Sequence, residues 1–344
     1  MVGRRTRVRT EQVPPTLEEV AAAAGVSRST VSRVVNGSPK VSPDVVTAVK
    51  AAIVELDYVP NRAARTLAGS HTHAVALVVP EVFSRFFGDP YFAAVVQGIH
   101  SRLTINDYIL NLLVSSSDPK HHAQRYLEGG NVDGALVLSH HAGDVQLVEL
   151  SRRLPLVLGG RPLVDGLADA YFVDVDNVDG AEQATRHLIS RGRRRIASIA
   201  GPRDMPAAID RLEGWRRGLR AADLSAERMV QSDFTISGGA RAMHRLLEHF
   251  DDLDAVFVAN DQMAVGALQV LIDSGRQVPG DVAVVGYDDS PVATSGRLPL
   301  STVRQPSEQM GTDMAEMLIM LLRGERPAQP AHLLPTTLIV RSSS

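Results

Sequence analysis

The sequence predicts a small all-α domain near the N-terminus, followed by an α/β core of two doubly wound parallel-sheet subdomains. Two observations support this fold class. Between residues 16 and 56, apolar residues recur at helical spacing between residues that favour helix ends. After residue 72, short β-branched or apolar runs alternate with helical stretches at intervals of roughly twenty to forty residues, which is typical of βαβ units. A chain of 344 residues, 44% of them hydrophobic, is sufficient for two or three domains.

The first two helices are predicted from the residues at their ends. Thr16 begins a capping box with Glu19, and an apolar face follows at helical spacing. Gly25 ends this helix and turns the chain. Ser27 is placed as the N-cap of a second helix over residues 28–36. Two short helices joined by a glycine-containing turn form a helix-turn-helix, whose second helix enters the major groove of DNA.

Several side chains of this unit are able to bond base edges or phosphates. They are Thr16, Ser27, Arg28, Ser29, Thr30, Ser32, Arg33 and Asn36. A third helix, capped by residues 42–44, is expected to pack on the first two through Val45, Val49, Ala52, Ile53 and Leu56. The alternative is a small three-helix domain with a polar surface, because helix-turn-helix patterns also occur in proteins that never bind DNA.

Residues 61–69 predict a further short helix of low intrinsic stability. Asn61 is an N-cap candidate and Gly69 a C′ glycine, so only about two turns lie between them, and such a helix is marginal in water. Leu67 is flanked by arginines, which suits insertion of an apolar wedge into a minor groove. The DNA contacts expected here are Asn61, Arg62, Ala64 and Leu67. The alternative is a linker helix that packs Leu67 onto the next domain.

Charge is distributed unevenly along the chain. Residues 1–69 contain ten Arg and Lys against six Asp and Glu, a net charge of +4, whereas the remainder carries −7, for a total of −3. The positive charge therefore lies on the segment that would neutralise phosphates. The basic tail of residues 1–15 either adds phosphate contacts or is a solvated extension.

Other classes of protein lack support. No apolar run reaches 18 residues and no apolar stretch follows the N-terminal arginines, so neither a membrane span nor a signal peptide is expected. The absence of cysteine excludes disulfides and fits a cytoplasmic protein. The histidine pairs at 121–122 and 140–141 lack metal-ligand spacing and are expected on a solvated surface or loop, and Trp215 is expected in the core. Without a catalytic motif, the sequence predicts no enzyme, cofactor or metal.

The remainder of the chain divides into two halves of similar size. Eight strands are expected, at 74–79, 109–114, 134–138, 156–158, 171–173, 196–200, 255–259 and 282–285. Residues 73–172, together with about 304–330, are assigned to one subdomain, and 173–303, with about 331–344, to the other. Residues 61–72 would connect this core to the helix-turn-helix domain at 16–60.

Polar side chains follow several of these strands. Ligands bind at the carboxyl ends of strands in open parallel sheets, so Asn260, Asp288 and Arg211 are candidates for contacting one. Such groups bond adjacent hydroxyls of a polyhydroxylated ligand, and an aromatic pair at 91–92 is able to cover a sugar ring. Taken singly, each has an ordinary alternative: Asn260 and Asp288 as helix caps, and Arg211 as a surface ion pair.

The N-terminal segments TLEEVAAAAGVS, TVSRVVNG, VSP and YVPNRAARTL resemble the LacI/GalR family of bacterial transcription regulators. The resemblance places three residues on the base-reading helix: Arg28, Ser29 and Arg33. It also places Asn61, Ala64 and Leu67 in a hinge helix, with Leu67 as the minor-groove wedge. In this family the two hinge helices of a dimer pair at the centre of a palindromic operator.

The resemblance continues through AGP followed by RLEGW, VANDQMAVGAL and VAVVGYDDS, and so spans nearly the whole chain. It implies the fold of periplasmic sugar-binding proteins, with two subdomains, a cleft and three crossovers. The effector-binding positions it implies are Tyr91, Phe92, Gly160, Arg161, Arg211, Asn260, Asp288 and Gln305. Sugar-responsive relatives often have an acid where this chain has Gly160-Arg161. The combination of LGGRPL, GPRDM and RLEGW is similar to the cellobiose-responsive repressors of the family.

These observations together predict an allosteric repressor. A homodimer is expected to bind a palindromic operator in double-stranded DNA, in the cytoplasm and on the nucleoid. A small-molecule effector, expected to be a sugar or oligosaccharide, would bind between the core subdomains as an inducer or, as in the purine-responsive branch, as a corepressor. The alternatives are a sugar-binding module for transport and an enzyme of sugar metabolism.

Overall fold

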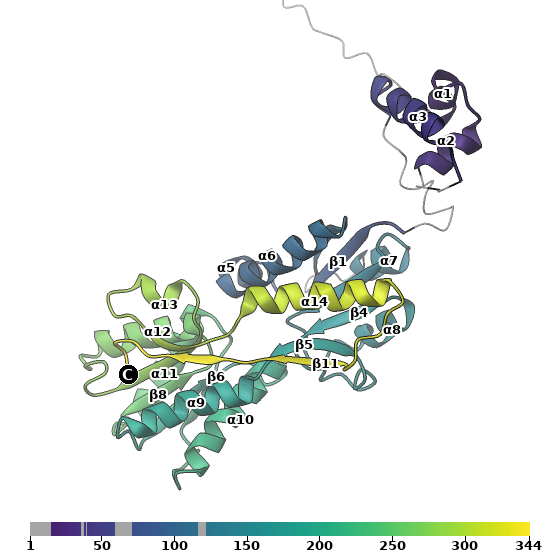
Figure 1. Cartoon of the computed structure of the whole chain (residues 1–344). Helices are drawn as coiled ribbons and strands as arrows, with labels where there is room; N and C mark the ends of the chain where they lie inside the picture. Colours follow the sequence, from purple (N-terminus) through teal and green to yellow (C-terminus); the bar gives the residue numbers. More distant parts are fainter. Residues whose placement is uncertain (1–14, 36–37, 39, 59–70, 116–121) are drawn as a thin grey trace, which may run out of the picture. The chain divides into compact units, whose positions relative to one another are not determined.

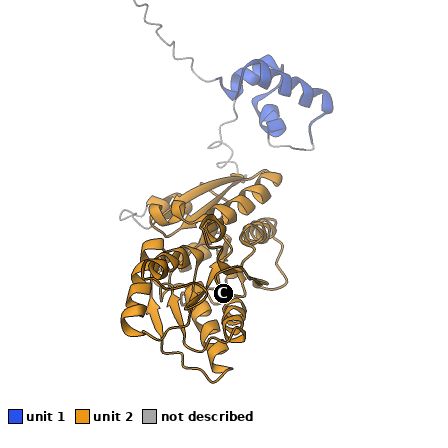
Figure 2. Ribbon diagram, turned by 90° about the vertical axis from the view of Figure 1, so that its left-hand side faces the viewer, with its two compact units in different colours: residues 1–70 blue, residues 71–344 orange. Residues whose placement is uncertain are grey.

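The computed structural model describes residues 15–35, 38, 40–58, 71–115 and 122–344. The chain forms two compact units, Met1–Ser70 and His71–Ser344, each of which is described by itself (Figure 2). No helix in the described part of the chain is long and apolar enough to cross a membrane.

In its described residues, the first unit contains three helices, α1 (Leu17–Ala23), α2 (Arg28–Val35) and α3 (Pro43–Glu55). The predicted capping box is present, because the Thr16 hydroxyl accepts from the Glu19 backbone while the Glu19 carboxylate accepts from the Thr16 N–H. Ser27 Oγ accepts from the Thr30 N–H at 3.2 Å, as expected of the residue before α2. Each helix contributes a fully buried valine to the core of this unit: Val20 from α1, Val31 from α2 and Val49 from α3. The helix-turn-helix expected from the sequence is therefore confirmed.

The first subdomain of the second unit is built on a six-stranded sheet in which every pair of neighbours is parallel. In spatial order its strands are β11 (Ala331–Leu334), β5 (Tyr171–Val175), β4 (Leu156–Gly159), β3 (Gly134–Leu138), β1 (Ala74–Val79) and β2 (Ile109–Val114). Its helices are α5 (Phe83–Gly88), α6 (Pro90–Ile105), α7 (His122–Glu128), α8 (Gln146–Arg153) and α14 (Ser307–Leu322) (Figure 1). Both faces of the sheet are covered: Leu77 packs with α6 and α14, whereas its neighbour Val78 packs with α7 and α8.

The second subdomain repeats this arrangement with one antiparallel edge strand. In spatial order its strands are β12 (Thr337–Ile339), β10 (Ser301–Arg304), β9 (Ala283–Asp288), β8 (Ala255–Val258), β6 (Ile196–Ala200) and β7 (Met229–Gln231). Its helices are α9 (Asn177–Ser190), α10 (Pro206–Arg220), α11 (Ile236–His249), α12 (Asp261–Asp273) and α13 (Val292–Ser295).

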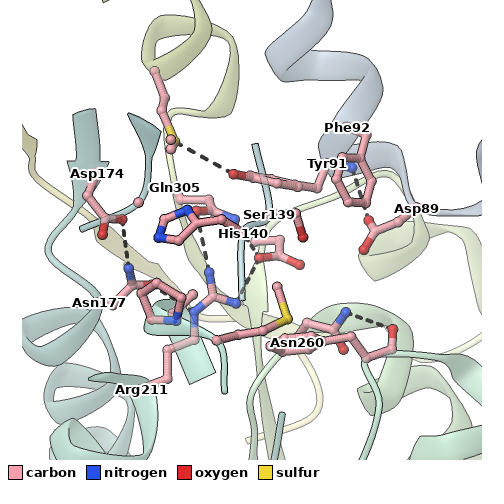
Figure 3. A pocket seen from close by; sticks show the side chains of 18 of the residues that line it. Asp89, Tyr91, Phe92, Ser139, His140, Asp174, Asn177, Arg211, Asn260 and Gln305 are labelled. Carbon is pink, nitrogen blue, oxygen red and sulfur yellow. Dashed lines mark hydrogen bonds and ion pairs between the residues drawn. The ribbon is translucent and has the colours of Figure 1, made fainter. Parts of the chain in front are cut away.

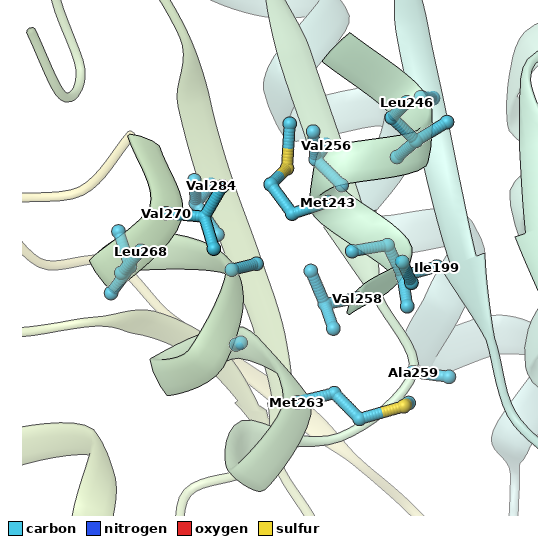
Figure 4. Close-up of a cluster of buried hydrophobic side chains, with 14 of the residues drawn as sticks. Ile199, Met243, Leu246, Val256, Val258, Ala259, Met263, Leu268, Val270 and Val284 are labelled. Carbon is cyan, nitrogen blue, oxygen red and sulfur yellow. The ribbon is translucent and has the colours of Figure 1, made fainter. Parts of the chain in front are cut away.

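Alternating strand residues again supply two cores in this subdomain. One lies between the sheet and helices α11 and α12, and Figure 4 shows Val256 and Val258 of β8 beside Met243 of α11. The other lies toward α9 and α10 and contains Phe257 and the fully buried Trp215, which confirms the expectation for Trp215.

The chain crosses between the subdomains three times, after β5, after β10 and between β11 and β12. Two of the expected boundaries require correction. The strand expected at 171–173 continues through the polar Asp174 to Val175, and since β5 is part of the first sheet, residues 173–175 belong to the first subdomain and not to the second. Strand β11 pairs with β5, so residues 331–334 belong to the first subdomain and not to the second.

Candidate ligand-binding site

A pocket lies between the two core subdomains, at the carboxyl ends of their parallel strands (Figure 3). Seven of the eight expected effector-binding residues line it: Tyr91, Phe92, Gly160, Arg211, Asn260, Asp288 and Gln305. Eleven of its nineteen lining residues have polar side chains, and the others supply apolar surface, so the pocket offers both kinds of contact to a ligand.

Arg211, on the first half of α10, is the central polar group of the pocket. Its Nε donates to Asn177 Oδ1 at 2.8 Å, and one terminal nitrogen donates to the Ala259 carbonyl at 2.7 Å and lies 3.3 Å from Asp288 Oδ1. The guanidinium also lies 3.7 Å from the centroid of the Tyr287 ring. Arg211 is 5% exposed. The alternative of a surface ion pair is therefore wrong, because this guanidinium is buried and held rigidly against a carboxylate.

Asp288 is the last residue of β9 and has a φ of +113°, a backbone conformation that side-chain-bearing residues rarely adopt. Gln305, at the second crossing, donates from Nε2 to Asp288 Oδ1 at 2.6 Å. Burial raises the pKa of Asp288 well above its ordinary value, and the Arg211 guanidinium opposes that shift. The strand end thus holds a buried carboxyl between a cation and an amide, as expected of a site prepared for a polar ligand.

Asn260 is both a pocket residue and a helix cap. Its Oδ1 accepts from the Met263 N–H at 3.0 Å at the start of α12, and its Nδ2 donates to the Phe234 carbonyl at 3.1 Å. The cap suggested as the alternative is therefore real. The side chain nevertheless lines the pocket, where it fixes the loop that carries the Phe234 ring.

The first subdomain contributes the aromatic side of the pocket. Asp89 caps α6 by accepting from the Tyr91 N–H at 3.0 Å, which fixes the first turn that carries Tyr91 and Phe92. Phe92 is 1% exposed, and the Tyr91 hydroxyl lies 3.7 Å from the Met310 sulfur. The start of α6 thus supplies a rigid apolar wall opposite Arg211.

Arg161 is the expected residue that the structure does not bring into the pocket. Its guanidinium binds Asp210 of α10 in a bidentate pair, with distances of 2.7 and 2.6 Å. Its backbone N–H donates to Asp174 Oδ2 at 2.8 Å. The preceding Gly160 does line the pocket and has a φ of +104°, which is strained for residues with a side chain.

Six polar pocket residues were not among the expected effector-binding positions: Arg85, Asp89, Ser139, His140, Asp174 and Asn177. Asp174 is 4% exposed, accepts from Asn177 Nδ2 at 3.0 Å, and has its pKa raised to about 6 by burial. His140, expected on a solvated surface or loop, is instead 1% exposed and lines the pocket. Arg85 of α5 also lines it. His140 follows β3 directly, so its place at the carboxyl end of a strand was the available signal.

A second polar cluster joins the subdomains beside the pocket. His141 Nδ1 lies 2.9 Å from Asp204 Oδ2, and its Nε2 lies 3.3 Å from Glu81 Oε1. Ser139 Oγ donates to the same Glu81 oxygen at 2.7 Å, and Arg85 forms an ion pair with it. Burial would raise the pKa of Glu81, but these partners outweigh it and hold the pKa below its ordinary value.

The residues expected to contact DNA lie on the first unit or outside the described residues. Thr16, Ser27, Arg28, Ser29 and Arg33 are exposed, and Thr30 and Ser32 are half-buried. Arg28 Nε lies 3.0 Å from Glu18 Oε1. Helix α2 ends at Val35. Five of the expected DNA contacts lie outside the described residues: Asn36, and on the hinge segment Asn61, Arg62, Ala64 and Leu67.

Comparisons with known proteins agree with both units. A model for bacterial regulatory proteins of the lacI family matches residues 16–61, and one for a periplasmic binding protein-like domain matches residues 185–344. The HTH-type transcriptional regulator CelR of Thermobifida fusca is 48% identical over 333 residues, 96% of this chain and 98% of that protein. The ribose operon repressor of Escherichia coli strain K12 is 35% identical over 311 residues, 88% and 92% of the two chains.

Two solved structures are similar over nearly the full length. A complex of the transcriptional regulator CelR with cellobiose has a TM-score of 0.76 at 46% identity, covering 96% of this chain and 100% of the other. A lac repressor dimer bound to operator and the anti-inducer ONPF has a TM-score of 0.83 at 28% identity, covering 96% and 99%. These relatives are transcriptional regulators and not enzymes. The chain therefore belongs to the LacI family of bacterial regulatory proteins.

Proposed function

We propose that this regulator is a repressor that binds a palindromic operator as a homodimer. Its affinity for the operator falls or rises when a sugar binds between the core subdomains. The arrangement of Arg211, Asp288 and Gln305 opposite the aromatic wall of α6 carries this proposal. A guanidinium, a carboxyl and an amide offer both donors and acceptors to adjacent hydroxyls. The ring of Phe92 offers an apolar face to a sugar ring.

A disaccharide is the effector that the known relatives of this chain support best. The relative of known ligand, CelR, has been solved with cellobiose and shares 46% of its residues with this chain. Cellobiose is therefore the first sugar to test.

The exposed face of α2 is the proposed base-reading surface. Arg28, Ser29 and Arg33 project from it without contributing to the core of the first unit. A dimeric lac repressor bound to operator is among the similar structures, which supports a palindromic site for this chain. A role on operator DNA would place the protein in the cytoplasm and on the nucleoid.

Control by the sugar requires that the core pass its state to the DNA-binding unit. We propose that the segment of residues 61–69, which lies outside the described residues, is the element through which it does so. The helix that the sequence predicts for this segment is short enough to be marginal alone. A modest coupling free energy of about 1–3 kcal/mol between sugar binding and DNA binding would then change operator affinity about 5–150-fold.

The test uses the full-length protein and duplex DNA that it selects from a random library. We expect a palindromic consensus, affinity that falls steeply with salt, and at least a fivefold change in affinity when cellobiose is added. The sign of that change distinguishes an inducer from a corepressor. Sugar binding without sequence-specific DNA binding would instead favour a sugar-binding module, and binding of neither would overturn the proposal.

A further inference from the structure

His140 has an unusual position in the pocket. Its side chain is 1% exposed and lines the pocket between the subdomains (Figure 3). Among the described residues, its Nδ1 is one of a few buried side-chain atoms without a hydrogen-bond partner. Buried polar atoms in native proteins are nearly always bonded, and an unbonded one needs a physical explanation.

The other ring nitrogen determines what this free atom is able to do. His140 Nε2 lies 3.1 Å from the backbone carbonyl oxygen of Arg161. A carbonyl only accepts, so Nε2 must carry the proton and donate it. In the neutral ring, Nδ1 is then without a proton and is an acceptor.

The surroundings keep the ring neutral. Burial lowers the pKa of His140 below its ordinary value, and this outweighs the opposing effects of the Arg161 carbonyl and Asp144. The nearby guanidinium of Arg161 acts in the same direction as burial. At neutral pH the buried ring therefore has an acceptor atom, Nδ1, without a hydrogen-bond partner in the described part of the protein.

Gly160 provides the space for the imidazole. A Cβ at this glycine would lie 3.5 Å from His140 Cε1 and 3.9 Å from Asp174 Oδ2. Any side chain longer than alanine would therefore compete with the ring for this position. Sugar-responsive relatives often have an acid at this place in the chain. Here two other acceptors lie beside Gly160 instead, the buried Asp174 carboxyl and His140 Nδ1.

We propose that His140 binds the effector directly, its Nδ1 accepting a hydrogen bond from one hydroxyl of a sugar in the pocket. The proposal rests on the sugar-binding function proposed above and assigns one specificity-determining residue within it. It requires a ligand that presents a donor at this point of the pocket, which a hydroxyl does and a ring oxygen or an ether does not.

Two variants separate the acceptor from the bulk of the ring. His140→Phe keeps a planar ring of similar size and removes the acceptor. His140→Asn is shorter and keeps an amide oxygen near the position of Nδ1. His187→Phe is the matched control, because His187 is a partly buried imidazole on α9 that does not line the pocket. Thermal unfolding of each full-length variant first identifies those that fold.

Calorimetry with cellobiose and its monodeoxy derivatives gives the measurement. We expect His140→Phe to weaken cellobiose binding about tenfold, His140→Asn to weaken it less, and His187→Phe to leave it unchanged. One monodeoxy derivative should bind the wild type about tenfold less tightly than cellobiose. The ratio between the affinities for cellobiose and for that derivative should be smaller in His140→Phe, which lacks the acceptor, than in the wild type.

The possible failures are distinguishable. If the wild type binds cellobiose and His140→Phe binds it equally tightly, the assignment of His140 is overturned while the sugar-binding function stands. The same conclusion follows if every monodeoxy derivative loses the same factor in affinity, relative to cellobiose, in the wild type and in His140→Phe. If the wild type binds neither cellobiose nor any other disaccharide, the proposed function fails, and this assignment fails with it.

Discussion

The imidazole of His141 and the carboxylate of Asp204 are joined at 2.9 Å between Nδ1 and Oδ2. His141 follows β3 in the first core subdomain, whereas Asp204 follows β6 in the second. The backbone N–H of Ala142 donates to the Asp204 carbonyl at 2.9 Å beside this pair. Since Glu81 holds the other ring nitrogen, the imidazole ties the two subdomains together in the arrangement seen.

This bridge should depend on pH. The hydrogen bond to Glu81, with a further contribution from Asp204, raises the pKa of His141 to about 9, above its ordinary value of 6.5. The folded form therefore binds the proton more tightly than the unfolded form. The stabilisation that the protonated His141 imidazole gives to the folded state is fully present below about pH 6.5 and is lost as the pH rises through about 9.

We therefore expect the wild type to be more stable than His141→Gln at pH 6.5, and the difference to shrink toward zero between pH 7 and 10. Unfolding in urea at a series of pH values measures it. Comparing each pH point with the variant removes the contribution of other groups that titrate in this range. A difference that stays constant up to pH 10 would show that the imidazolium is not the stabilising form.

A second pair, Arg161 with Asp210, also joins the subdomains. If Arg161 acts through this pair, Arg161→Ala and Asp210→Ala should weaken sugar binding by similar factors, and the double variant should be no weaker than either single one. Calorimetry with the sugar found to bind measures all four proteins. A markedly larger loss for Arg161→Ala than for Asp210→Ala would restore Arg161 as a direct ligand contact.

Much of the fold was predictable because both faces of each sheet are buried. All eight expected strands are present, and the continuous apolar run of β1 is buried along its whole length, as is typical of a strand covered on both sides. The strands that were missed, β7, β10, β11 and β12, have only three or four residues each. Three of them lie at sheet edges or carry exposed positions, so their apolar pattern is weak.

The site was predictable where residues lie at the carboxyl ends of strands that the sequence identifies, as Asn260 does after β8 and Asp288 does at the end of β9. It was less predictable where a side chain is recruited by tertiary contacts. Asp174 extends a strand beyond its apolar run, and His140 is one of two adjacent histidines that differ completely in their surroundings. The Arg161 side chain lies outside the pocket because it pairs with Asp210 on α10. The two residues are far apart in the sequence, so no local sequence pattern predicts their pairing.

Arg211→Ala should destabilise the core and abolish the sugar response. It leaves Asp288 buried without its cation, and removing one member of a buried pair costs about 3–5 kcal/mol. We expect a value near the lower end, because burial already raises the pKa of Asp288 and the carboxyl is able to take up a proton. Urea unfolding measures the stability, and calorimetry at a temperature where the variant is folded measures sugar binding.

Arg217→Ala is the matched control, because Arg217 is on the same helix, is exposed, and pairs with Glu213 at the surface. It should change stability by no more than about 0.5 kcal/mol and leave sugar binding intact. Equal stability of the two variants would contradict the destabilisation expected from breaking the buried pair. A normal sugar response in Arg211→Ala would place the ligand-binding site elsewhere.

The hinge prediction concerns Leu67, which the sequence pattern assigns to the proposed hinge segment. Leu67→Ser replaces the proposed apolar wedge with a polar side chain that gains little from entering a base step. We expect specific operator affinity to fall at least about tenfold, while nonspecific DNA binding and sugar affinity stay unchanged, because both are assigned to other parts of the chain. Leu67→Met keeps an apolar side chain of similar size and should retain most of the affinity. Retention of selected and scrambled duplexes measures both kinds of DNA binding, and equal operator affinity of Leu67→Ser and wild type would remove the wedge from the mechanism.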